Sequence, residues 1–170
     1  MDRIRLNNGV EMPAEGFGVF QVNDLAVCRQ ACLDAIDAGY RLIDTASLYN
    51  NEEAVGDAVR EAIAAGKVTR EELFITTKLW TNDASYDGAK RSFERSMEYL
   101  GLEYLDMFMI HMPYGDFYGA WKAMTELYRE GRIRALAVSN FYAGKLTEFA
   151  EIVEVKPQVD QLELHPFYTR

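Results

Sequence analysis

The sequence predicts an α/β fold that forms one domain over residues 1–170 and is built from parallel βα units. Short apolar runs, each long enough for one strand, alternate with segments whose apolar residues recur at helical period. The repeat is about thirty residues, enough for a strand, a helix and their loops. Ionisable side chains end several of the runs, and α/β folds gather their chemistry at the carboxyl ends of parallel strands.

A β-hairpin is expected ahead of the first βα unit. Asn8-Gly9 supplies left-handed turn residues between the extended segments 3–6 and 10–12. Six strands are expected after it, at 17–20, 41–45, 73–77, 104–110, 133–138 and 158–162. The expected helices begin after Asp24 and then cover 52–65, 85–99, 117–130 and about 143–150. This alternation implies that the strands run parallel.

Composition and charge restrict the possible partners. The formal net charge of −9 argues against a nucleic-acid or anionic-membrane surface. The first residues lack the apolar region of a secretory signal, and no apolar run approaches the length of a membrane span. Cys28 and Cys32 share a face of a predicted helix, as two reduced core residues would. We therefore expect a cytoplasmic location and no metal site, since a second ligand pair is absent from the sequence.

The most informative stretch is residues 39–52, which has the pattern of a helix end, a strand and a loop that opens the next helix. Asp44 ends the apolar strand, where a buried carboxylate is costly unless it is paired. Tyr49 follows in the loop, beside Asn50 and Asn51 as candidate helix N-caps. Taken alone, the stretch fits a structural interpretation equally well: a buried Asp that caps a turn and a Tyr that packs its ring.

Two later residues favour a functional interpretation, because Lys78 and His111 also end apolar runs. All four side chains are then expected at one edge of the sheet. Reduction of a carbonyl by hydride needs a proton on the oxygen, and Tyr49 can supply it as a general acid. Lys78 would lower the phenol pKa, and Asp44 would hold Lys78 and compensate its charge. His111 would orient the carbonyl through a hydrogen bond.

At these residues the chain resembles the aldo-keto reductases. Separate blocks fall in the family's order and spacing, from about residue 7 to the last residue. The matching residues are 39–46 with Tyr49, 77–80, 110–111, 139–141, and Gln161 ahead of His165-Pro166. The resemblance implies a (β/α)8 TIM-barrel type of fold, here incomplete at about six βα units, because such a barrel needs about 250 residues. It also assigns the roles given above to Asp44, Tyr49, Lys78 and His111.

The resemblance further implies NADPH as the cofactor, with Ser139, Asn140 and Gln161 as ligands of the nicotinamide carboxamide. Ordinary turn chemistry after a strand is the alternative for the Ser-Asn pair. The sequence has no Gly-x-Gly-x-x-Gly, so a Rossmann site is not indicated. In the family, most of the residues that bind the cofactor phosphates lie in strands seven and eight and their loops, which have no counterpart among these residues.

Three aromatic residues are candidates for an apolar substrate pocket. Phe20 and Trp80 match pocket positions of the family, and Tyr114 is inferred from its place near a strand end; plain core packing is the alternative for all three. The sequence thus predicts NADPH-dependent reduction of aldehydes or ketones to alcohols. A fragment or pseudoenzyme that acts only when oligomerised or complemented by another chain is the alternative, because six strands leave two open edges. The intact group of four argues against a non-catalytic module.

Overall fold

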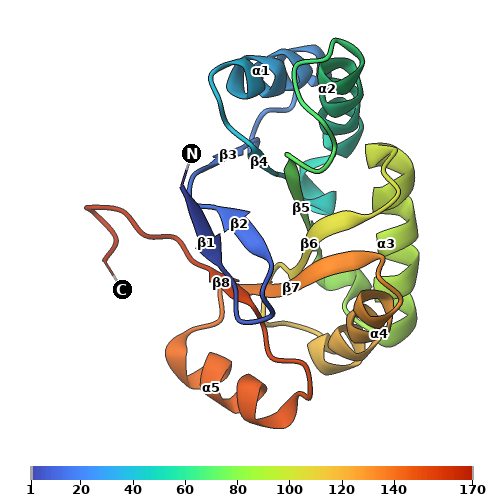
Figure 1. The fold of residues 1–170 in the computed structure, drawn as a ribbon. Coiled ribbons are helices and arrows are strands. Elements are labelled where there is room, and N and C mark those ends of the chain that lie inside the picture. The colour runs from blue at the N-terminus through green and yellow to red at the C-terminus, as the bar shows by residue number, and fades with distance from the viewer. Residues whose placement is uncertain (1, 170) are drawn as a thin grey trace.

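A computed structural model describes residues 2–169 and contains a hairpin followed by a six-stranded parallel sheet. The hairpin pairs β1 (Arg3–Arg5) with β2 (Glu11–Pro13) in antiparallel register. The sheet has the strand order β3-β4-β5-β6-β7-β8, so every strand lies beside its neighbour in the chain (Figure 1). Its strands are β3 (Gly16–Gly18), β4 (Leu42–Asp44), β5 (Phe74–Leu79), β6 (Leu105–Ile110), β7 (Ile133–Ser139) and β8 (Val159–Gln161).

Within residues 2–169, five α-helices lie along the outer face of the curled sheet (Figure 1). They are α1 (Leu25–Asp37), α2 (Glu52–Ala64), α3 (Tyr86–Leu100), α4 (Phe117–Arg129) and α5 (Ala143–Ile152). Short 3₁₀ turns at Ser47–Tyr49 and Thr81–Asp83 precede α2 and α3. None of the helices in residues 2–169 combines the length and the apolar character needed to cross a bilayer.

Two apolar clusters hold these layers together. The larger cluster fills the space between the sheet and the helices, around residues such as Phe93, Phe108 and Trp121. The smaller cluster lies inside the curl, where Leu6 of the hairpin packs with Phe74 and other strand residues. This division is typical of a barrel wall, with helices outside and side chains inside. The predicted fold, an incomplete (β/α)8 barrel of six βα units with an N-terminal hairpin, is confirmed.

The first strand of the sheet is shorter than expected. It covers Gly16–Gly18, whereas the sequence pattern predicted a strand that runs to Phe20. A turn ends it, because the backbone N–H of Val22 donates to the carbonyl of Val19 at 3.2 Å and Gln21 adopts a left-handed φ of 63°. Phe20 therefore stands at the tip of a turn above the strand ends. In contrast, β5 extends to Leu79, so that Lys78 lies within the strand.

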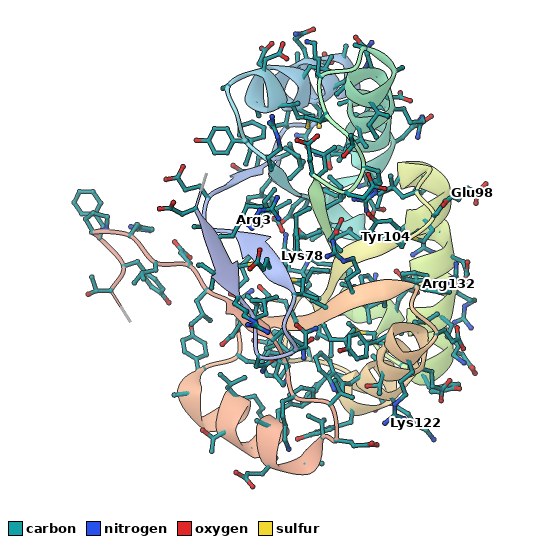
Figure 2. The ribbon with its side chains drawn as sticks, viewed as in Figure 1. Arg3, Lys78, Glu98, Tyr104, Lys122 and Arg132 are labelled. Atoms are coloured by element: carbon teal, nitrogen blue, oxygen red, sulfur yellow. The ribbon has the colours of Figure 1, made fainter. Side chains whose placement is uncertain are left out.

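A buried ionic group connects β5, β6 and β7 near their amino-terminal ends. Asp106, fully buried in β6, accepts a hydrogen bond from the backbone N–H of Ile75 at 2.9 Å. Its carboxylate also pairs with Arg70 and Arg134, each at 2.7 Å. The guanidinium of Arg70 in turn lies 4.0 Å from the ring centroid of Tyr104, a residue labelled in Figure 2. The position of the group, far from the strand ends that carry the other polar residues, indicates a role in stability.

Asp106→Ala is expected to lower the free energy of unfolding by about 3–5 kcal/mol, because it removes the acceptor of a buried N–H and the partner of two guanidinium groups. Urea unfolding followed by circular dichroism measures the change. Asp57→Ala is the matched control, since Asp57 pairs with Arg60 on the exposed surface of α2 and such pairs contribute about 1 kcal/mol at most. Equal losses in the two variants would contradict the prediction.

Candidate active site

The site is organised around the ammonium group of Lys78, which is 1% exposed. Its Nζ lies 2.5 Å from Oδ2 of Asp44, at the end of the neighbouring strand β4, and 2.9 Å from the carbonyl oxygen of Thr45. It also lies 3.4 Å from the hydroxyl of Tyr49. Figure 2 labels Lys78 near the centre of the curled sheet. The structure thus brings three of the four predicted polar groups into direct contact, and the buried charge is paired.

Thr76 is a member of this group that the sequence reasoning missed. Its Oγ1 donates to Oδ1 of Asp44 at 2.5 Å, while Oδ2 of Asp44 faces Lys78. Each carboxylate oxygen is therefore fixed by a different residue of β5. The alternation of side chains along a strand could have revealed Thr76, because residues 76 and 78 of one strand point to the same face of the sheet.

Local backbone geometry places Tyr49 over the end of β5. The 3₁₀ turn Ser47–Tyr49 is joined to that strand by the hydroxyl of Ser47, which donates to the carbonyl of Lys78 at 2.9 Å. Asn50 ends the turn with a left-handed φ of 53°, a conformation that Asn tolerates better than most residues. As a result the Tyr49 ring lies with its centroid 5.0 Å from Nζ of Lys78.

The pKa of Tyr49 shifts in the opposite direction to the sequence-based expectation that Lys78 would lower it. Burial, followed by the nearby carboxylate of Asp44, raises the pKa of Tyr49 to about 12. Burial also lowers the pKa of Lys78, against the opposing pull of Asp44. The pKa of Tyr49 rises although the ammonium of Lys78 lies 3.4 Å from the phenol oxygen, because burial disfavours the phenolate and Asp44 at 2.5 Å compensates the ammonium charge. Tyr49 is therefore protonated throughout the neutral range, so its hydroxyl is able to donate a proton.

His111 follows β6 and completes the group of four. Its ring lies 5.6 Å from the Tyr49 ring and 5.0 Å from the Trp80 ring, both in edge-on geometry. Burial, with the charge of Lys78 as the second cause, lowers the pKa of His111 to about 4. The imidazole is thus neutral above pH 5. Nδ1 is enclosed and has no hydrogen-bond partner within residues 2–169, which favours the tautomer with the proton on Nε2, since an orphaned lone pair costs less than an orphaned N–H.

The lowered pKa of His111 predicts a loss of stability in acid. The unfolded chain takes up this proton near pH 6.5 and the folded chain only near pH 4, so stability falls as the pH drops through that window. His111→Gln should remove up to about 3 kcal/mol of the difference in unfolding free energy between pH 7 and pH 4. Urea unfolding of both proteins at the two pH values measures it. His165→Gln, which removes the exposed second histidine, is the control; an unchanged pH dependence in His111→Gln would refute the prediction.

The three predicted carboxamide ligands lie together beside His111. Ser139 of β7 pairs in register with Gln161 of β8, and its hydroxyl donates to the Gln161 carbonyl at 3.0 Å. Asn140 donates through Nδ2 to the carbonyl of His111 and to Oγ of Ser139, both at 3.1 Å. Asn140 has a left-handed φ of 62°, a conformation that Asn tolerates better than most residues. Gln161 reaches across the curl to Oδ1 of Asp44 at 3.4 Å.

The three predicted pocket residues differ in position. The Phe20 ring lies 4.9 Å from the Tyr49 ring, and Trp80 contacts His111, so both flank the polar group. Tyr114 is 61% exposed in the loop after β6, and within residues 2–169 no ring contact joins it to the other aromatic residues of the site. The structure therefore brings Phe20 and Trp80 to the site and leaves Tyr114 at its margin.

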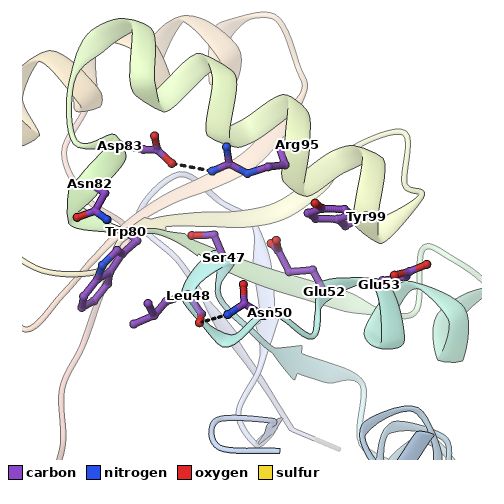
Figure 3. Close-up of a pocket in the computed structure, with 10 residues that line it drawn as sticks. All are labelled: Ser47, Leu48, Asn50, Glu52, Glu53, Trp80, Asn82, Asp83, Arg95 and Tyr99. Atoms are coloured by element: carbon purple, nitrogen blue, oxygen red, sulfur yellow. Dashed lines mark hydrogen bonds and ion pairs between the residues drawn. The ribbon is translucent and has the colours of Figure 1, made fainter. Parts of the chain in front are cut away.

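Two hollows adjoin the polar group. One, of about 320 Å³, lies inside the curl between the hairpin and the sheet and is lined by Asp44, Thr76 and Gln161 among others. The other, of about 440 Å³, lies beyond Trp80 between the start of α2 and α3. Figure 3 shows this outer cleft, with the Asp83–Arg95 ion pair of 2.6 Å on its α3 side. The outer cleft contains none of the four central side chains.

The fold and the site together define a barrel-type α/β protein with Tyr, Lys, Asp and His at the strand ends. Comparisons with known proteins agree with that class. The family model described as "Aldo/keto reductase family" matches residues 18–170. The chain belongs to this family.

Individual relatives support the assignment. Glyoxal reductase of Bacillus subtilis is 46% identical over 170 residues, an alignment that covers 99% of this chain and 60% of the relative. A 9,11-endoperoxide prostaglandin H2 reductase of Trypanosoma cruzi is 45% identical, over 97% of this chain and 57% of the relative. The crystal structure of a Bombyx mori aldo-keto reductase in complex with NADP superposes with a TM-score of 0.95 at 36% identity, over 99% of this chain and 60% of that one. The chain thus spans about 60% of the length of these relatives.

Proposed function

We propose that this chain carries the catalytic group of an NADPH-dependent carbonyl reductase that converts aldehydes or ketones to alcohols. The contact of Lys78 Nζ with both Asp44 and the Tyr49 hydroxyl carries the proposal, because it places a proton donor beside a buried, compensated ammonium. Membership of the Aldo/keto reductase family and the names of its relatives support the same reaction.

In the proposed reaction, bound NADPH supplies a hydride to the carbonyl carbon and leaves as NADP⁺. The hydroxyl of Tyr49 donates its proton to the carbonyl oxygen, so the substrate gains one hydride and one proton overall. Lys78 stabilises the phenolate that remains until solvent returns the proton, and Asp44 holds Lys78 in place. Neutral His111 donates a hydrogen bond from Nε2 to the same oxygen and orients the carbonyl.

The residues near His111 suit the carboxamide of the nicotinamide. No hydrogen bond within residues 2–169 uses the side-chain oxygens of Asn140 or Gln161, so both remain available as acceptors for a carboxamide N–H. The Ser139 hydroxyl lies between them. We therefore assign these three residues as ligands of the cofactor. The bound NADP in the Bombyx mori structure supports the choice of cofactor.

We propose small carbonyl compounds as substrates, with Phe20 and Trp80 as the walls of the pocket and Tyr114 as a further contact at its margin. The similarity to glyoxal reductase favours short aldehydes. The test is the loss of NADPH absorbance at 340 nm in the presence of glyoxal, with detection of the alcohol product. Oxidation of NADPH that does not depend on the aldehyde would refute the proposal.

A second candidate function is that of a partial domain that acts only with a complementing chain or a second copy. The observation behind it is the sheet itself, in which β3 and β8 each have one neighbour and the inner hollow lies between the hairpin and the sheet. Closure of such a barrel needs eight strands. Unpaired strand edges attract other strands, so either partner could supply the missing pairing.

A further inference from the structure

The turn that carries Phe20 requires an external support. Phe20 and Gln21 are its two central residues, and Gln21 has a left-handed φ of 63°, which costs free energy in a residue other than glycine or asparagine. One hydrogen bond closes the turn, from the N–H of Val22 to the carbonyl of Val19 at 3.2 Å. Phe20 is 61% exposed at the tip, yet its ring stays 4.9 Å from that of Tyr49. Something must hold the turn against the Tyr49 loop.

The buried side chain of Asn51 supplies that support. Its Nδ2 donates to the carbonyls of Val19 at 2.9 Å and Val22 at 3.1 Å, the first and last residues of the turn. Its Oδ1 accepts a hydrogen bond from Oγ1 of Thr45 at 2.7 Å. The carbonyl of Thr45 is one of the acceptors of Lys78. One amide thus connects the Phe20 turn with the strand end that holds Lys78.

Asn51 does not use its side chain in the way its position suggests. It occupies the N-cap of α2, where Asn normally accepts a hydrogen bond from the first turn of its own helix. Here its side chain makes no such capping bond. Glu52 and Glu53 in the first turn provide the negative charge that favours this helix end. The side-chain amide of Asn51 therefore makes no hydrogen bond to the first turn of α2 and bonds instead to Val19, Val22 and Thr45.

We propose that Asn51 is a positioning residue that sets the separation of Phe20 and Tyr49, and thereby the place of the apolar wall beside the reacting carbonyl. The inference deepens the proposed function and rests on it. Asn51 lies two residues after Tyr49, between the 3₁₀ turn and α2, and its amide donates to the turn that presents Phe20. Without the amide, the strained turn loses two of the three hydrogen bonds described above and Phe20 moves away from Tyr49.

The test compares Asn51→Ser with the wild-type chain. Serine keeps the helix-capping preference of the position but is too short to reach both carbonyls of the turn. Nuclear Overhauser contacts between the Phe20 and Tyr49 rings, assigned with Phe20→Leu and Tyr49→Phe, are expected in the wild type and absent in Asn51→Ser. Under conditions that give turnover, the KM for an aromatic aldehyde should rise about tenfold in Asn51→Ser. The kcat for glyoxal should change much less than the KM for the aromatic aldehyde, since glyoxal is too small to depend on the Phe20 wall.

Asn50→Gly is the matched control. It removes the neighbouring amide, which donates to the carbonyl of Leu48 at 3.1 Å and to no other group in residues 2–169 (Figure 3), and glycine keeps the left-handed backbone. Ring contacts that persist in Asn51→Ser would overturn the inference. If that variant does not fold, Asn51→Asp takes its place; failure of both to fold where Asn50→Gly folds would also overturn it, by showing a general structural need. If Asn51→Ser loses the ring contacts but the wild-type chain reduces no aldehyde even with a complementing chain present, the proposed function alone is refuted.

Discussion

Tyr49→Phe is expected to reduce the turnover of carbonyl substrates by about 10²–10⁴-fold, the contribution typical of a positioned general acid. The variant removes the hydroxyl that lies 3.4 Å from Nζ of Lys78 and keeps the ring that contacts Phe20 and His111. The affinity for NADPH and the fold should therefore change little. Steady-state kinetics and nucleotide titration on the same preparations separate these effects.

Tyr114→Phe is the matched control for this substitution, because Tyr114 is exposed at the margin of the site. It should retain the kcat of the wild type, whether or not its KM changes. Wild-type turnover in Tyr49→Phe would show that another group donates the proton.

The second large effect concerns the cofactor. We expect the 170-residue chain to bind NADPH weakly, with a Kd near or above about 1 mM, which corresponds to about −4 kcal/mol. The residues assigned to the carboxamide offer a few neutral hydrogen bonds of about 0.5–1.5 kcal/mol each, and these cannot offset the entropy lost when a large dinucleotide is held. A second polypeptide that matches the last two βα units and tail of a family member should restore micromolar binding.

Calorimetric titration of NADPH into the chain, with and without that polypeptide, measures the difference. The polypeptide alone is the control, and light scattering reports whether the two form a complex. Micromolar binding by the chain alone would contradict the expectation and show that some other surface, such as that of a second copy, contacts the phosphates.

Much of this structure follows from local rules. Alternating strands and helices predicted every βα unit in its correct order, because each apolar run forms a strand buried between the outer helices and the interior of the curled sheet. The cost of a buried, unpaired charge predicted that Lys78 would lie against Asp44. The positions of polar groups at strand ends follow from the parallel arrangement, which collects the ends of β4, β5 and β6 at one edge.

Other features depend on contacts between distant residues. Asn51 was one of two candidate N-caps, and its side chain bonds to the Phe20 turn instead of its own helix because that turn brings two carbonyls within its reach. The pKa of Tyr49 was expected to fall. The direction of its shift depends on burial of the phenol and on how far Asp44 compensates the charge of Lys78. Phe20 lies outside the strand in which it was predicted, because the left-handed backbone at Gln21 closes a turn there. Sequence patterns do not reveal such distances.

The most direct test of the proposed chemistry is the fate of the hydride. Glyoxal is incubated with NADPH deuterated at the transferable position and with the chain complemented as above, and the alcohol product is examined by mass spectrometry. We predict that each new alcohol carries deuterium on carbon from the cofactor, and that Tyr49→Phe yields almost no product. An unlabelled alcohol, or the absence of product when calorimetry shows bound NADPH, would contradict the assignment of this site to carbonyl reduction.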